Sequence, residues 1–139
     1  MRSLAQIGTL IEREESEDAA SAHAGELLRL GEEVLEHWVV ARDKTPTSAE
    51  SEGFRLLALH RQGSKSAPSF NACRETCREL VYHYNLISLD PDHADTEKRL
   101  ILMRHLVRHL YYFVSGKMQN EQLGEFCCSS RPLRLNDAS

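Results

Sequence analysis

All four prolines of the chain fall between segments in which apolar residues recur at helical spacing. Proline inside a helix removes a backbone hydrogen bond and clashes with the preceding turn, so these residues indicate boundaries between helices. Leucine occurs 19 times, whereas valine and isoleucine together occur 10 times, and this bias favours helices over strands. We therefore predict an all-α protein, a small helix bundle of about four helices. The prolines are Pro46, Pro68, Pro91 and Pro132.

Capping signals predict where two of the helices begin. Ser3 and Gln6 form a capping box ahead of a short first segment, and Thr47 and Glu50 form a second capping box. The longer helices are expected over residues 18–43, 47–61, 70–86 and 91–115. Between the second and third of these, residues 62–68 contain small and turn-forming residues that predict a loop.

The last helix is expected to begin at Asp90–Pro91, which combines an N-cap acid with proline at the first helical position. Gly116 is its expected C-cap. The 139 residues fit one domain, and a hydrophobic content of 41% is enough for a buried core, which excludes general disorder. We expect a single helical-bundle domain over residues 1–116. Residues 117–139 are expected to be a C-terminal tail, extended or docked on the bundle or on a second subunit.

The long helix over residues 18–43 has an apolar face that is broader than one neighbouring helix would cover. An apolar surface of this kind is typical of a protein interface, so we predict a homodimer formed through this face. Glu32, Glu33 and Glu36 lie outside the apolar face on a helical projection. The residues expected at the dimer interface are Leu27, Leu30, Val34 and Trp38.

Two histidines of the last helix have a spacing typical of metal ligands. His105 and His109 are one turn apart, so two imidazoles could bind one zinc or iron ion. Such a site needs further ligands, and the sequence lacks the Glu-x-x-His pattern of diiron bundles and the His-Glu-x-x-His pattern of zinc proteases. Cys73 and Cys77 fall on the expected buried face of their helix, where the alternative is that they only fill space. The further ligand candidates are His83, His37, Cys73 and Cys77.

A basic segment over residues 61–78 is the third candidate site. Its loop leads into a helix start, where free backbone N–H groups and nearby positive side chains favour an anion. The segment is not a P-loop, because the Gly-Lys-Ser order and a preceding strand are both missing. The alternative is a solvated turn. The residues expected to bind phosphate or nucleic acid are Arg61, Lys65, Arg74 and Arg78.

Charge is distributed unevenly along the chain. Residues 1–52 carry 5 basic and 12 acidic side chains, whereas residues 53–139 carry 12 basic and 9 acidic ones. This asymmetry can orient two subunits or steer a charged partner, although charged helix faces also serve solubility. The net charge of −4 does not fit a dedicated nucleic-acid-binding protein.

The expected compartment is the cytoplasm. No apolar run reaches the length of a membrane span, and the acidic first residues do not resemble a signal peptide. The four cysteines, among them the adjacent Cys127 and Cys128, are therefore expected to be free thiols in a reducing compartment. No spacing of serine, cysteine, histidine and acid selects a catalytic triad, and no cofactor is required.

These features favour a small cytoplasmic helical module that binds or regulates a partner through protein–protein contacts. The first alternative is a metal-binding or thiol-dependent bundle that uses the His105 and His109 pair. The second is phosphate or nucleic-acid binding through residues 61–78.

Overall fold

The structure, a computed structural model, describes residues 1–13, 19–65, 70 and 73–121. The predicted all-α class is confirmed, because this part of the chain is helical apart from turns, loops and one isolated bridge. It contains five helices where about four were expected. They are α1 (Leu4–Glu12), α2 (Ala20–Ala41), α3 (Arg55–Ser64), α4 (Arg74–Leu89) and α5 (Thr96–Asn120).

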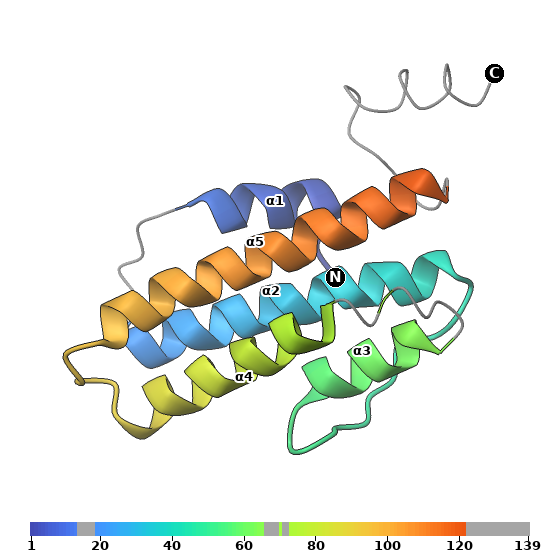
Figure 1. Cartoon of the computed structure of the whole chain (residues 1–139). Helices are drawn as coiled ribbons and strands as arrows, with labels where there is room; N and C mark the ends of the chain where they lie inside the picture. Colours follow the sequence, from blue (N-terminus) through green and yellow to red (C-terminus); the bar gives the residue numbers. More distant parts are fainter. Residues whose placement is uncertain (14–18, 66–69, 71–72, 122–139) are drawn as a thin grey trace.

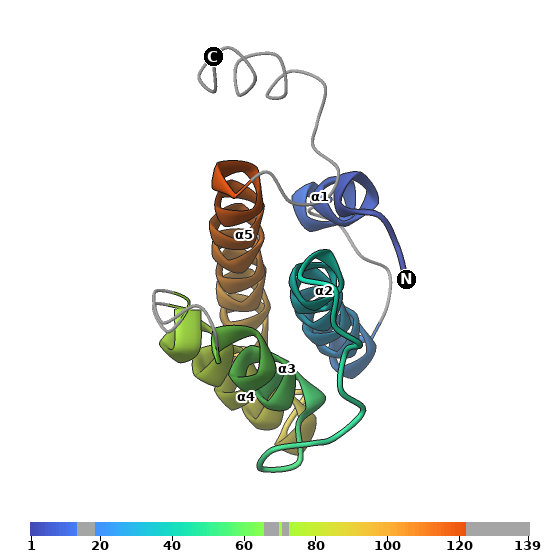
Figure 2. The same cartoon turned by 90° about the vertical axis from the view of Figure 1, so that its right-hand side faces the viewer.

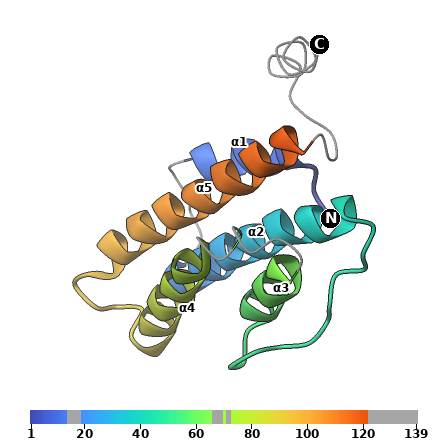
Figure 3. The same ribbon diagram turned by 45° about the vertical axis from the view of Figure 1, so that its right-hand side comes forward.

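Helix α2 lies at the centre of the bundle and contacts each of the four other helices. Figure 1 shows α2 and α5 running in the same direction, with α4 antiparallel to both. Viewed from the side, α1 covers one side of the α2 and α5 pair, and α3 and α4 cover the other (Figure 2). Helices α3 and α4 lie next to each other along α2 (Figure 3) and are in contact.

The apolar face of α2 is wide because four other helices of the same chain pack against this helix. The predicted dimer-interface residues lie in the core, where they are out of reach of a second copy in this structure. The prediction of these interface residues is therefore corrected, while the homodimer itself stays a prediction. The exposed fractions are 3% for Leu27, 1% for Leu30, 0% for Val34 and 1% for Trp38.

The acidic side of α2 is also more buried than the projection indicates. Glu33 and Glu36 expose only 3% and 8% of their surface. The Arg2 guanidinium donates to both carboxylate oxygens of Glu33, at 3.0 and 2.8 Å, and also contacts Glu26. We call the whole set the arginine–glutamate network. It consists of Arg2, Arg29 and Arg55 with Glu26, Glu32, Glu33 and Glu36.

The two capping boxes have different outcomes. Ser3 and Gln6 exchange both expected hydrogen bonds, so the first prediction is confirmed and α1 begins at Leu4. Thr47 does not start a helix, because its backbone N–H donates to Gln62 Oε1 at 2.9 Å and its carbonyl accepts from Arg55 Nε at 2.8 Å. These bonds hold the segment along α3, which begins only at Arg55.

Helix α3 continues into the predicted loop and ends at Ser64. Trp38 Nε1 donates to the carbonyl oxygen of Gly63 at 3.0 Å and so joins α2 to the last turn of α3. A Cβ atom at position 63 would lie 2.8 Å from Trp38 Cδ1, so only glycine permits this close approach of the two helices. The contact holds the end of α3 against α2.

Helices α4 and α5 differ from their expected bounds. α4 spans Arg74–Leu89, and residues 91–95 form turns, so α5 begins at Thr96 instead of Pro91. Gly116 is not a C-cap, because α5 continues through it to Asn120 and places Met118 in the core. Residues 117–120 of the expected tail are therefore helical, and residues 122–139, with Cys127 and Cys128, lie outside the described residues. None of the described helices is long and apolar enough to cross a membrane.

Candidate functional site

Three of the four predicted anion-binding residues meet at one cavity between α3 and α4. Arg61 lies in the last turns of α3, and Arg74 and Arg78 lie one turn apart at the start of α4. Lys65 follows α3 and is exposed, but it does not line this cavity. The cavity has a volume of about 250 Å³. Its lining residues are Ser51, Glu52, Leu57, His60, Arg61, Ser64, Arg74 and Arg78.

The arginines of this cavity differ in their partners. Arg78 Nη1 lies 3.0 Å from Glu52 Oε2 and forms an ion pair. Within the described ranges, neither Arg61 nor Arg74 forms an ion pair with a carboxylate. With three arginines against the single carboxylate of Glu52, the lining carries two uncompensated positive charges. The cavity therefore favours an anion.

Glu52 is held beside Arg78 by an unusual turn. Ser51 and Phe54 exchange two backbone hydrogen bonds of 3.0 Å, and the two residues between them have positive φ angles, 54° for Glu52 and 84° for Gly53. Glycine adopts this conformation readily, but glutamate does so at a cost. Glu52 is not among the site residues predicted from the sequence, although the Glu-Gly dipeptide ahead of an apolar run is a turn signal.

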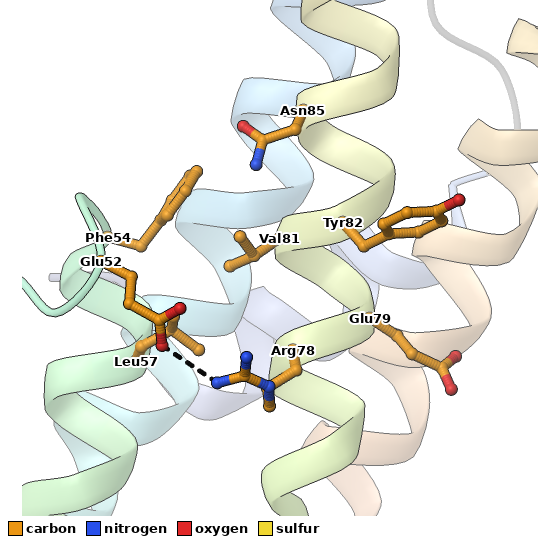
Figure 4. Close-up of a pocket in the computed structure, with 8 residues that line it drawn as sticks. All are labelled: Glu52, Phe54, Leu57, Arg78, Glu79, Val81, Tyr82 and Asn85. Atoms are coloured by element: carbon orange, nitrogen blue, oxygen red, sulfur yellow. Dashed lines mark hydrogen bonds and ion pairs between the residues drawn. The ribbon is translucent and has the colours of Figure 1, made fainter.

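A second cavity, of about 380 Å³, lies beside the first, and Figure 4 shows the residues that line it. Both cavities are lined by Glu52, Leu57 and Arg78, so they are neighbours, and we call the two together the α3–α4 groove. The cavity with Arg61 and Arg74 is its cationic half, and the second cavity is its apolar half. The residues that line only the apolar half are Phe54, Glu79, Val81, Tyr82 and Asn85.

His60 lies at the base of the cationic half and is 6% exposed. Its Nε2 donates to the carbonyl oxygen of Phe70 at 3.1 Å, and the two rings are stacked with centroids 5.7 Å apart. The same carbonyl oxygen accepts from Cys73 Sγ at 3.1 Å. The histidine is therefore held in place by buried groups beneath the groove.

Cys73 and Cys77 are free and fully buried, at 0% exposure. A hydrogen bond between the two thiols lowers the pKa of Cys73 and raises that of Cys77, and burial raises both. His60 adds to the lowering for Cys73. Neither thiol lines the groove.

Among the described residues, the predicted histidine ligands are not grouped with the two thiols at one site. His105 and His109 are on an exposed face of α5, and Arg108 Nη1 donates to His105 Nδ1 at 3.0 Å while its guanidinium pairs with Glu12. In the described part of the chain, no three histidine, cysteine or acidic side chains are grouped as a metal ion would require. The predicted zinc or iron site therefore has no third ligand among these residues.

The two other histidines predicted as ligands lie apart from this pair: His37 Nε2 donates to the carbonyl oxygen of Arg2 at 2.6 Å, and His83 lies half-buried on α4. Burial lowers the pKa of its imidazole, the charge of Arg99 acts in the same direction, and Glu79 opposes both. Its Nδ1 is buried and has no hydrogen-bond partner in the described structure. This favours the neutral ring.

Comparison with protein-family models, curated proteins and solved structures finds no significant match to this chain.

Proposed function

We propose that the protein is a binding module whose ligand carries a phosphate group, held in the cationic half of the α3–α4 groove. The observation that carries the proposal is the convergence of Arg61, Arg74 and Arg78 on one cavity, with two of the three lacking a carboxylate partner among the described residues. Two of these arginines come from the start of one helix and the third from the end of the preceding one. One bound anion would therefore contact both helices.

The chemistry of the lining favours phosphate over a simple carboxylate. A guanidinium presents parallel N–H donors that match two oxygens of a phosphate, and a phosphate dianion balances the two uncompensated positive charges of the lining. Arg74 and Arg78 lie in the first turns of α4, so the positive end of the helix dipole adds to the same field. Ser51 and Ser64 supply further hydroxyl groups at the rim.

The test is titration of the protein with inorganic phosphate and pyrophosphate by isothermal calorimetry. The double variant Arg61→Ala/Arg74→Ala should bind at least about tenfold more weakly, because each charge-assisted contact to an ionised group contributes about 1.5 kcal/mol or more. The matched control is Arg13→Ala/Lys98→Ala, which removes two exposed positive charges outside the groove and should retain the affinity. Circular dichroism should show the same helix content in both variants.

Salt provides an independent check on the same proposal. Raising ionic strength from about 50 to about 200 mM should weaken binding by roughly fivefold, because exposed charges are screened over a shorter distance. Binding that is equal in the two double variants, or that does not respond to salt, would contradict an anion site in this groove.

A further inference from the structure

The apolar half of the groove gives information about the rest of the ligand, so this inference rests on the proposed function and extends it. Phe54, Leu57 and Val81 form its apolar wall, and the Asn85 amide points toward the same side as Phe54 (Figure 4). An apolar wall with a single amide at its end suits a flat ring whose edge carries hydrogen-bonding groups. The two cavities, of about 250 and 380 Å³, together have the size of a small-molecule site.

The length of the groove sets the spacing between the two parts of the ligand. Arg74 and Asn85 are eleven residues apart on α4, which corresponds to about 16 Å along the helix axis. Both residues line the groove, and a phosphate attached directly to a ring would be too short to contact both. A spacer about as long as a sugar is needed between the phosphate and the ring.

Charge fixes the orientation of such a ligand. The cationic half has a surplus of arginines, whereas the apolar half is lined by Glu52, Glu79 and a single arginine, Arg78. A phosphate is therefore attracted to one end and repelled from the other, and the apolar end accepts an uncharged group. This polarity disfavours a ligand with phosphates at both ends.

We propose that the α3–α4 groove binds a phosphate monoester of the nucleoside monophosphate type, with the phosphate on Arg61 and Arg74 and the heterocycle between Phe54 and Asn85. Glu52 and Arg78 lie where the two halves meet, and the ligand's phosphate competes with the Glu52 carboxylate for Arg78. Glu52 thus lowers the affinity for anions and keeps Arg78 in place while the groove is empty.

The experiment compares four probes by calorimetry on the full chain: inorganic phosphate, ribose 5-phosphate, adenosine and adenosine 5′-monophosphate. The nucleotide should bind at least about tenfold more tightly than ribose 5-phosphate, since burying an aromatic ring contributes more than the 1.4 kcal/mol that a tenfold change requires. Asn85→Ala should weaken nucleotide binding about fivefold, a loss typical of one hydrogen bond, and leave inorganic phosphate unaffected. The matched control is Asn120→Ala, an exposed asparagine at the end of α5.

The Glu52→Gln variant tests whether the Glu52 carboxylate competes with the ligand's phosphate for Arg78. Removing the competing carboxylate should raise the affinity for inorganic phosphate and for the nucleotide by a similar factor, about threefold or more. Weaker binding of both in this variant would overturn the competition with Glu52.

The outcomes separate this inference from the proposed function. If the nucleotide binds no more tightly than ribose 5-phosphate, or Asn85→Ala weakens phosphate and nucleotide equally, the inference is overturned and the phosphate site stands. If adenosine binds as tightly as the nucleotide, the ring is bound but the phosphate site fails. If none of the probes binds, both proposals fail.

Discussion

Arginines that pair with the glutamates of α2 and arginines in the α3–α4 groove face different surroundings. In the arginine–glutamate network, Arg2, Arg29 and Arg55 are matched by four glutamates, two of which are among the buried charged residues of the molecule. In the cationic half of the groove, Arg61 and Arg74 line a cavity that has a single carboxylate, Glu52. Glu52 pairs with Arg78.

The arginine–glutamate network stabilises the fold, whereas the arginines of the groove remain available to a ligand. A buried carboxylate such as Glu33 is stable only because Arg2 and Arg29 compensate for its lost hydration. The exposed arginines of the groove remain hydrated and make little contribution to folding. Their charge is therefore available for binding.

The largest effect is expected from breaking the network at Glu33. We expect Glu33→Ala to lower the free energy of unfolding by about 2 kcal/mol, because Arg2 and Arg29 each lose a charge-assisted hydrogen-bond partner. The loss is smaller than for a fully buried ion pair, because the Arg2 side chain is 31% exposed and water can replace part of the interaction. Urea unfolding followed by circular dichroism measures it.

Arg74→Ala is the matched variant in the groove. It should change the free energy of unfolding by less than about 0.5 kcal/mol, as is usual for an exposed residue without a specific partner. A loss as large as that of Glu33→Ala would show that both regions serve folding and would remove the distinction between them.

A smaller, pH-dependent effect should come from the same carboxyl group. Burial alone would raise the pKa of Glu33, but hydrogen bonds from the side chain and backbone of Arg2 outweigh it and lower the pKa below the ordinary value of 4.5. The carboxylate therefore stabilises the fold above about pH 4.5, and this contribution is lost as the pH falls through the lower, folded-state pKa. The difference in unfolding free energy between the native chain and Glu33→Gln should shrink from pH 6 toward pH 3. A difference that stays constant would contradict the shift.

Local patterns predicted the helices well where the chain's own periodicity decides the structure. The periodicity predicts a helix over residues 18–43, and α2 spans Ala20–Ala41. The predicted capping box at Ser3 is also formed. The Thr47 capping box failed because the backbone of this segment bonds instead to Gln62 and Arg55, a choice that depends on how the loop folds back on α3. Capping signals describe only neighbours in sequence.

The same limit applies to burial. Periodicity shows how wide the apolar face of α2 is, but not whether a second chain or four helices of the same chain cover it. Glu33 lies outside the apolar face, yet it is buried because Arg2, 31 residues away, folds over it. Such pairings require the tertiary structure.

The candidate site was predictable in part. Arg61, Arg74 and Arg78 come from the end of one helix and the start of the next, so their closeness in sequence already places them together. Glu52 and Phe54 precede α3 and reach the groove only through the turn at Gly53. The apolar half could not be inferred without the packing of that turn against α4.

The smallest effect is expected at Lys65, which distinguishes the sequence prediction from the observed groove. Lys65 belongs to the same basic segment as the arginines but does not line either cavity. Lys65→Ala should therefore weaken phosphate binding by less than about twofold through the loss of a distant, screened charge, whereas Arg74→Ala should weaken it several times more. Calorimetry with inorganic phosphate at a fixed ionic strength of about 100 mM, where screening acts over about 10 Å, compares the two variants. If Lys65→Ala has the larger effect, the anion is held by the segment that follows α3 and not by the groove. If the two variants are equal, the charge of the whole segment attracts the anion, and the cavity between α3 and α4 does not select it.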